Sequence, residues 1–267
     1  MTGPPAFEEL VSQIERRTAI MQDAIFLAES GSIAVRERPG RTLRDLMFHL
    51  GTVQRGWAEM IPEWQVPRRL RTAEAAGDGG LYEWVQRSTL LLTHALRTVG
   101  PDVASLTRWA PGGPPMTARH IARRQLQETT VHAYDAQVGI GRPEPVPDGI
   151  AINGIDEFLR ARLAAQGPWP YRPAQIEVRV SMTPAPTVAG PLRREPPMRW
   201  LLDLGPAGAH VISPGAGKPV ATLSGRAGDV LLALYGRSPL LVADTAGDER
   251  AIGRLLEWAD TSCSFAF

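Results

Sequence analysis

The chain has 267 residues, a net charge of +1 and a single cysteine, Cys263. A charge so close to neutral gives no electrostatic reason to expect nucleic acid or an anionic membrane as the main partner. One cysteine excludes an intrachain disulfide and a cluster of thiolate metal ligands, and it fits a reducing cytosol.

The N-terminal segment has none of the features of a secretory signal. Acids and arginines occupy residues 1–18, where a signal peptide needs an apolar core. No segment reaches the roughly 18 to 20 apolar residues that a membrane-spanning helix requires. We therefore expect a cytoplasmic protein, present as a monomer or a homodimer.

The first part of the chain has the apolar spacing of amphipathic helices. The predicted helices cover Phe7 to about Ala28, Thr42 to Pro62, Leu81 to about Val99, about Thr117 to Gly139, and Ile150 to about Gln166. Thr42, with Asp45 three residues later, resembles a capping box at the start of the second helix. The first four of these helices are joined by mostly short breaks. They predict a bundle in which facing helices can present ligands inward.

The composition changes at GPWPYRP, residues 167–173, which we interpret as a stiff linker between domains. Strand-like runs and two further helices follow. The strands are expected at 176–180, 199–204, 209–213 and 220–224, and the helices at 227–235 and 249–259. The predicted fold class is therefore α+β, with a helical bundle in residues 1–166 and a small α+β domain in residues 174–267.

Three residues on two helices form a candidate metal site. Glu128 and His132 are four residues apart, which places both side chains on one face of the fourth helix. His49 lies beside the apolar stripe of the second helix and should point toward the core or its edge. Three protein ligands with one open position are typical of catalytic zinc, and the open position could hold a thiol that loses its proton.

Other interpretations of these residues stay open at this stage. The spacing of Glu128 and His132 also fits an ordinary hydrogen-bonded pair of acid and imidazole. Asp135 either accepts a hydrogen bond from a ligand imidazole or pairs with a nearby arginine. A cluster of arginines at the start of the fourth helix is either a basic rim for an anionic substrate or a solvated face. The cluster consists of Arg119, Arg123 and Arg124.

Three segments of the sequence resemble the mycothiol-dependent maleylpyruvate isomerase family of actinobacteria. They are RTLRDLMFHLGTVQRGW at 41–57, RRQLQETTVHAYDAQVGIGRP at 123–143 and VATLSGRAGDVLLALYGRSPL at 220–240. The resemblance covers most of the chain. It implies a DinB-like metal-binding bundle followed by a C-terminal α+β domain.

The resemblance also implies site residues. Zinc ligands of the family match His49, Glu128 and His132, and a functional arginine in a Gly-Arg step matches Arg237. Without the resemblance, Arg237 is better interpreted as an arginine just beyond a helix C-terminus, where the helix dipole stabilises a positive charge. With the resemblance, the two interpretations have equal weight.

The function that the resemblance implies depends on mycothiol, a low-molecular-weight thiol, as cosubstrate. Its zinc-bound thiolate would act as nucleophile on a small electrophilic substrate. We expect an S-transferase that conjugates or exchanges thiols. A maleylpyruvate-type cis-trans isomerase is one alternative, and a metal-stabilised binding or regulatory protein without catalysis is another.

Overall fold

The computed structural model describes residues 5–28, 32–35, 40–63, 80–108, 115–182, 196–237 and 243–260. The chain divides into two compact units, the first ending at Glu144 and the second beginning at Pro145. The α+β fold class is confirmed, with a helical unit followed by a sheet unit. Cys263 and residues 184–195 of the proline-rich segment 184–197 lie outside the described residues.

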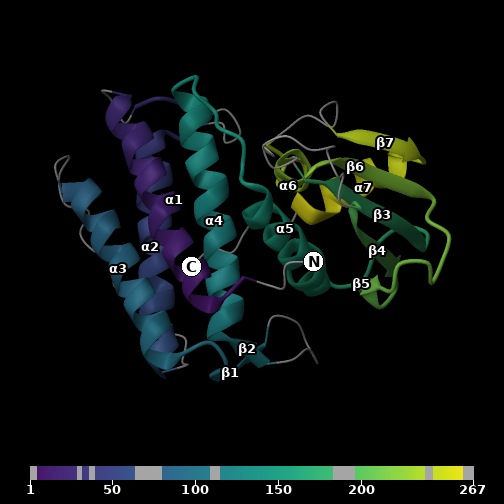
Figure 1. Cartoon of the computed structure of the whole chain (residues 1–267), viewed down its shortest axis with the longest axis horizontal. Coiled ribbons are helices and arrows are strands. Elements are labelled where there is room, and N and C mark those ends of the chain that lie inside the picture. Colours follow the sequence, from purple (N-terminus) through teal and green to yellow (C-terminus); the bar gives the residue numbers. More distant parts are fainter. Residues whose placement is uncertain are drawn as a thin grey trace, which may run out of the picture. The chain divides into compact units, whose positions relative to one another are not determined.

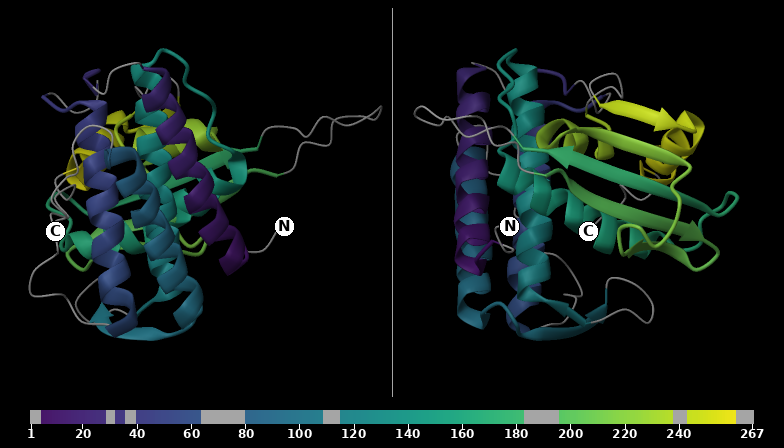
Figure 2. Two further views of the ribbon diagram at one scale, coloured as in Figure 1. Left: turned by 90° about the vertical axis from the view of Figure 1, so that its left-hand side faces the viewer. Right: turned by 45° about the vertical axis from the view of Figure 1, so that its right-hand side comes forward.

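In its described residues, the first unit contains a bundle of four helices (Figure 1). They are α1 (Phe7–Leu27), α2 (Leu43–Glu63), α3 (Gly80–Val99) and α4 (Ala118–Gly139). Helix α4 packs against both α1 and α2, and α3 packs against α2 and α1 (Figure 2). The capping box of α2 is present, because the Thr42 N–H donates to Asp45 and the Asp45 N–H donates to the Thr42 hydroxyl. The core contains the apolar stripes that the sequence predicted, including Leu10, Ile14, Leu46, Leu50, Leu92 and Ile121.

Two short strands precede α4 where the sequence predicted only a connector. They are β1 (Ala104–Arg108) and β2 (Pro115–Thr117), and they pair antiparallel. Their brevity hides the alternation that identifies a strand. Thr117 then caps α4, because its hydroxyl accepts the N–H of His120 while its own N–H donates to His120 Nδ1.

The second unit is built on a five-stranded sheet in the order β5-β4-β3-β6-β7. Strand β3 lies at the centre, antiparallel to β4 and parallel to β6. One face of β3 is apolar, since Ile176, Val178 and Val180 are fully buried. The strands are β3 (Ala174–Ser181), β4 (Met198–Gly205), β5 (Gly208–Ile212), β6 (Ala221–Arg226) and β7 (Asp244–Gly247). The sequence analysis missed β7, whose residues show no apolar alternation.

The helix expected at 150–166 has three parts in the structure. An α-helix, α5 (Asp148–Glu157), continues as a π-helical turn, η1 (Phe158–Arg162), and ends as a 3-10 turn, η2 (Leu163–Gln166). It packs against α6 (Ala227–Leu234) within the second unit, which also contains α7 (Glu249–Asp260). The boundary between the two compact units therefore lies before α5, whereas the sequence analysis placed the boundary between domains at the linker 167–173.

No helix in the described parts of the chain is apolar over a length that could span a bilayer.

The contact between α2 and α3 depends on Gly51. A Cβ at this position would lie 2.3 Å from Cζ3 of Trp84, whose buried ring stacks on Phe48. Helix propensity alone would make Gly51→Ala stabilising by about 1 kcal/mol. We expect the opposite, a loss of about 2 kcal/mol in the free energy of unfolding, because the stacked ring has to shift.

Urea unfolding of the variant checks this expectation. Gly253→Ala in α7 is the matched control, since a Cβ there meets nothing within 4 Å. It should gain about 0.5 to 1 kcal/mol. A Gly51→Ala protein as stable as the control would contradict the packing of α2 on α3.

Candidate metal centre

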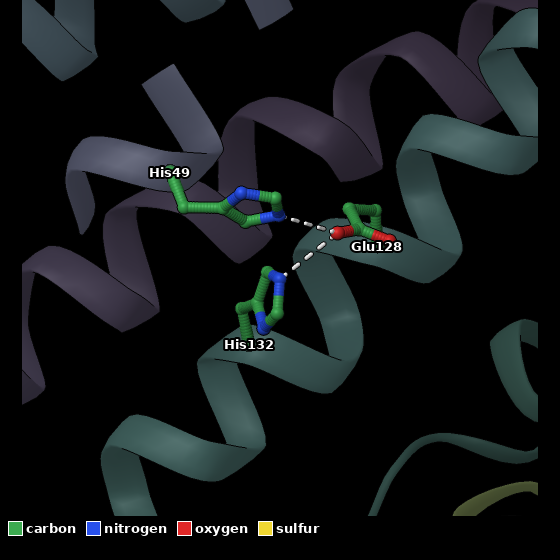
Figure 3. Close-up of side chains that lie close together, drawn as sticks. All are labelled: His49, Glu128 and His132. Carbon is green, nitrogen blue, oxygen red and sulfur yellow. Dashed lines mark hydrogen bonds and ion pairs between the residues drawn. The ribbon is translucent and has the colours of Figure 1, made fainter. Parts of the chain in front are cut away.

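Three side chains from two helices of the first unit converge on one point (Figure 3). Nε2 of His49, from α2, lies 3.1 Å from Oε1 of Glu128, from α4. Nε2 of His132, one turn further along α4, lies 3.0 Å from the same oxygen. The two imidazole rings meet edge to face with centroids 5.4 Å apart. The three residues predicted from sequence are thus brought together.

The exposure of the three side chains shows how a ligand would reach them. The exposed fraction is 39% for His49, 22% for Glu128 and 2% for His132. His49 lies at the edge of the apolar stripe of α2, where Leu46 and Leu50 are buried. His132 faces the interior of the bundle. The centre is therefore open to solvent on the His49 side and closed on the His132 side.

The electrostatics keep Glu128 ionised. Burial alone would raise the pKa of Glu128, but the charge of His132, hydrogen bonds from His132 and His49, and the charge of Arg124 hold that pKa well below its usual range. Burial lowers the pKa of His132, yet Glu128 and Asp135 outweigh it and raise the pKa. A proton and a metal ion compete for Nε2 of His132, so the affinity for the ion should fall as the pH is lowered.

The donor set fits a zinc ion. Bonds of about 2.0 to 2.1 Å in tetrahedral geometry place neighbouring ligand atoms about 3.3 Å apart. The two N···O distances are 3.0 and 3.1 Å, and the three potential ligand atoms lie within 4.8 Å of one another. Side-chain movements that widen each N···O distance by a few tenths of an ångström and bring the two nitrogens to a similar spacing would admit the ion. In the part of the chain that the structure describes, this group has three members, so a four-coordinate ion would keep one position for a ligand from outside.

The arginine cluster at the start of α4 does not form one surface. Arg124 is buried, and its positive charge acts on Glu128 one turn away. Arg119 lies over the ring of Phe7, with its guanidinium carbon 5.8 Å from the ring centroid. Arg123 is half-buried. The sequence analysis missed the electrostatic interaction between Arg124 and Glu128. Their spacing of four residues, which places both side chains on one face of a helix, could have indicated it.

Arg237 belongs to the second unit, where it ends α6. Gly236 has a φ of +70°, and the N–H groups of Gly236 and Arg237 donate to the carbonyls of Ala233 and Leu232. This is the Schellman arrangement that closes many helices. The Arg237 guanidinium donates to the carbonyl of Tyr235 at 2.7 Å. Within its own unit, Arg237 therefore lies just beyond the C-terminus of α6. This is the helix-terminal position of the second interpretation given in the sequence analysis.

The protein therefore has two domains. The helical unit brings two imidazoles and a carboxylate together in a candidate metal centre, and a small α+β unit follows it. Two family models match this chain, the mycothiol maleylpyruvate isomerase N-terminal domain over residues 33–137 and the MDMPI C-terminal domain over residues 149–254. The chain belongs to the mycothiol-dependent maleylpyruvate isomerase family, an enzyme family.

Two solved structures share the fold. They are crystal structures of the mycothiol-dependent maleylpyruvate isomerase and of a histidine-to-alanine mutant of it. Each has a TM-score of 0.55 and 15% sequence identity, over 92% of this chain and 96% of that chain. At this identity the likeness shows the fold alone. Comparison with curated proteins gives no match.

Proposed function

We propose that the protein is a zinc-dependent enzyme that uses mycothiol as its thiol cosubstrate and adds the thiol sulfur to a small electrophile. The observation that supports this most strongly is the group of His49, Glu128 and His132. It offers three ligand atoms and keeps one side open to solvent. A site serving only the stability of the bundle would have no use for an open position.

A zinc ion held by these residues would lower the pKa of a thiol in the open position, so that the thiolate predominates near neutral pH. The protein residues then have two tasks. Glu128 and His132 fix the deep side of the site, where water has little access. His49, the most exposed of the three, lines the side from which thiol and substrate approach.

The chemistry of the substrate follows from the nucleophile. Addition of the thiolate to an activated carbon–carbon double bond forms a C–S bond and moves the π pair onto a conjugated carbonyl oxygen, giving an enolate. A guanidinium can stabilise such an oxygen, or a substrate carboxylate, with two parallel hydrogen bonds. We assign this task to Arg237 on the basis of the family resemblance.

The fate of the C–S bond separates two outcomes. If rotation about the former double bond is followed by loss of the thiolate, the product is the trans isomer of the substrate. If the enolate carbon takes up a proton instead, the thiol stays attached and the reaction is an S-transfer. Family membership supports isomerisation, with maleylpyruvate as the candidate substrate that the family name supplies. S-transfer remains the alternative.

Mass spectrometry and NMR of the products distinguish these outcomes. The zinc-loaded protein is incubated with mycothiol and maleylpyruvate, with a chelator-treated sample as control. A product of unchanged mass and trans geometry supports isomerisation, and a product heavier by one mycothiol supports S-transfer. Zinc-loaded protein that converts nothing in the presence of mycothiol contradicts the proposed enzyme and favours a binding or regulatory protein.

A further inference from the structure

Asp135 lies on α4 directly behind the metal centre. Its side chain is completely buried, and Oδ2 is 3.4 Å from Nδ1 of His132. His132 points its other nitrogen, Nε2, toward Glu128. The imidazole of His132 therefore lies between two carboxylates, one on each ring nitrogen.

The two nitrogens of an imidazole have complementary roles when one of them binds a metal. Nε2 can offer its lone pair only if the ring proton stays on Nδ1, and the group that accepts a hydrogen bond from Nδ1–H fixes both the tautomer and the ring orientation. A carboxylate acceptor also makes the imidazole a stronger electron-pair donor. His132 is 2% exposed, so water has little access to take over this task.

We propose that Asp135 is a positioning residue of the metal centre, which accepts a hydrogen bond from Nδ1–H of His132 and so directs Nε2 toward the ion. This inference rests on the proposed zinc site. It assigns to Asp135 a role in metal affinity, and not only a role in the stability of the bundle.

The test compares zinc binding by Asp135→Asn, Asp135→Ala and the wild type. Zn²⁺ affinity is measured by competition with a chromophoric chelator, after circular dichroism has established that each metal-free protein is folded. We expect Asp135→Ala to bind zinc about 10- to 100-fold more weakly. Asparagine keeps an acceptor oxygen without the charge, so Asp135→Asn should fall between alanine and the wild type. The visible spectrum of the Co²⁺-loaded proteins should change in the same order, since it reports the geometry of the site.

Thr129→Val is the matched control. Thr129 is a buried polar residue of the same helix, and its hydroxyl donates to the carbonyl of Gln125. Its loss should lower stability and leave zinc affinity within about twofold of the wild type, because the hydroxyl donates to a backbone carbonyl of α4 and not to a ligand side chain.

Each outcome of the comparison has a distinct meaning. Folded Asp135 variants that bind zinc as tightly as the wild type would overturn the role of Asp135. An equal loss of affinity in Thr129→Val would overturn it too, because the effect would then be a general loosening of α4. A wild-type protein that binds no stoichiometric zinc would instead overturn the metal site itself. If Asp135→Ala does not fold, the near-isosteric Asp135→Asn carries the test.

Discussion

Replacing His132 by alanine is expected to remove zinc from the purified protein and to abolish its mycothiol-dependent activity. His132 supplies one of three ligand atoms and is the most deeply buried of them, and alanine offers no ligand atom in its place. Loss of one of three ligands should weaken zinc binding by about a thousandfold or more. Metal analysis after dialysis and the rate of substrate consumption measure the two effects.

His120→Ala is the control on the same helix. His120 takes part in the N-terminal cap of α4 through Thr117 and does not belong to the ligand group. This variant should keep full zinc content, with a loss of stability of about 1 kcal/mol from the weakened cap. Full zinc occupancy in His132→Ala would be incompatible with the proposed ligand set.

The second large effect is expected at Arg237. Arg237→Ala should keep stoichiometric zinc but lower turnover by about 100-fold, the usual scale for loss of one group that stabilises developing negative charge. Arg237→Lys restores the charge without the two-pronged geometry, and it should recover only part of the activity. Steady-state kinetics with zinc-loaded proteins gives both values.

The structural alternative for Arg237 makes a different prediction. If its task is only to bind the carbonyl of Tyr235 at the end of α6, then Arg237→Ala should lower the free energy of unfolding by up to about 1 kcal/mol. Turnover would be unchanged in that case. Such a result would remove Arg237 from the proposed chemistry and leave the zinc site untouched.

The candidate site could be found from sequence because its geometry is mostly local. Glu128 and His132 share a face of α4 by helical periodicity, and His49 follows the apolar stripe of α2. The resemblance to a family joined the two helices, which periodicity cannot do. The close approach of His49 to Glu128, across 79 residues of sequence, is a tertiary contact that only the fold provides.

The features that sequence reasoning missed depend on tertiary packing. The helix at 148–157 has an ordinary amphipathic pattern, which does not reveal that it packs on α6 in the second unit. Arg124 looks like part of a solvated basic cluster, yet the bundle buries it and brings its charge to bear on Glu128. Strand β2 has three residues and begins with a proline, too short a segment for any periodicity to show.

The central claim is that the metal centre keeps a coordination position open for a thiol. X-ray absorption at the zinc edge tests it most directly, with spectra of the zinc-loaded protein recorded before and after addition of mycothiol. Before addition, we expect only nitrogen and oxygen neighbours at about 2.0 to 2.1 Å, including two imidazoles. After addition, one sulfur neighbour should appear at about 2.3 Å. A zinc environment that is unchanged by mycothiol would contradict the claim that this centre keeps a position open for a thiol.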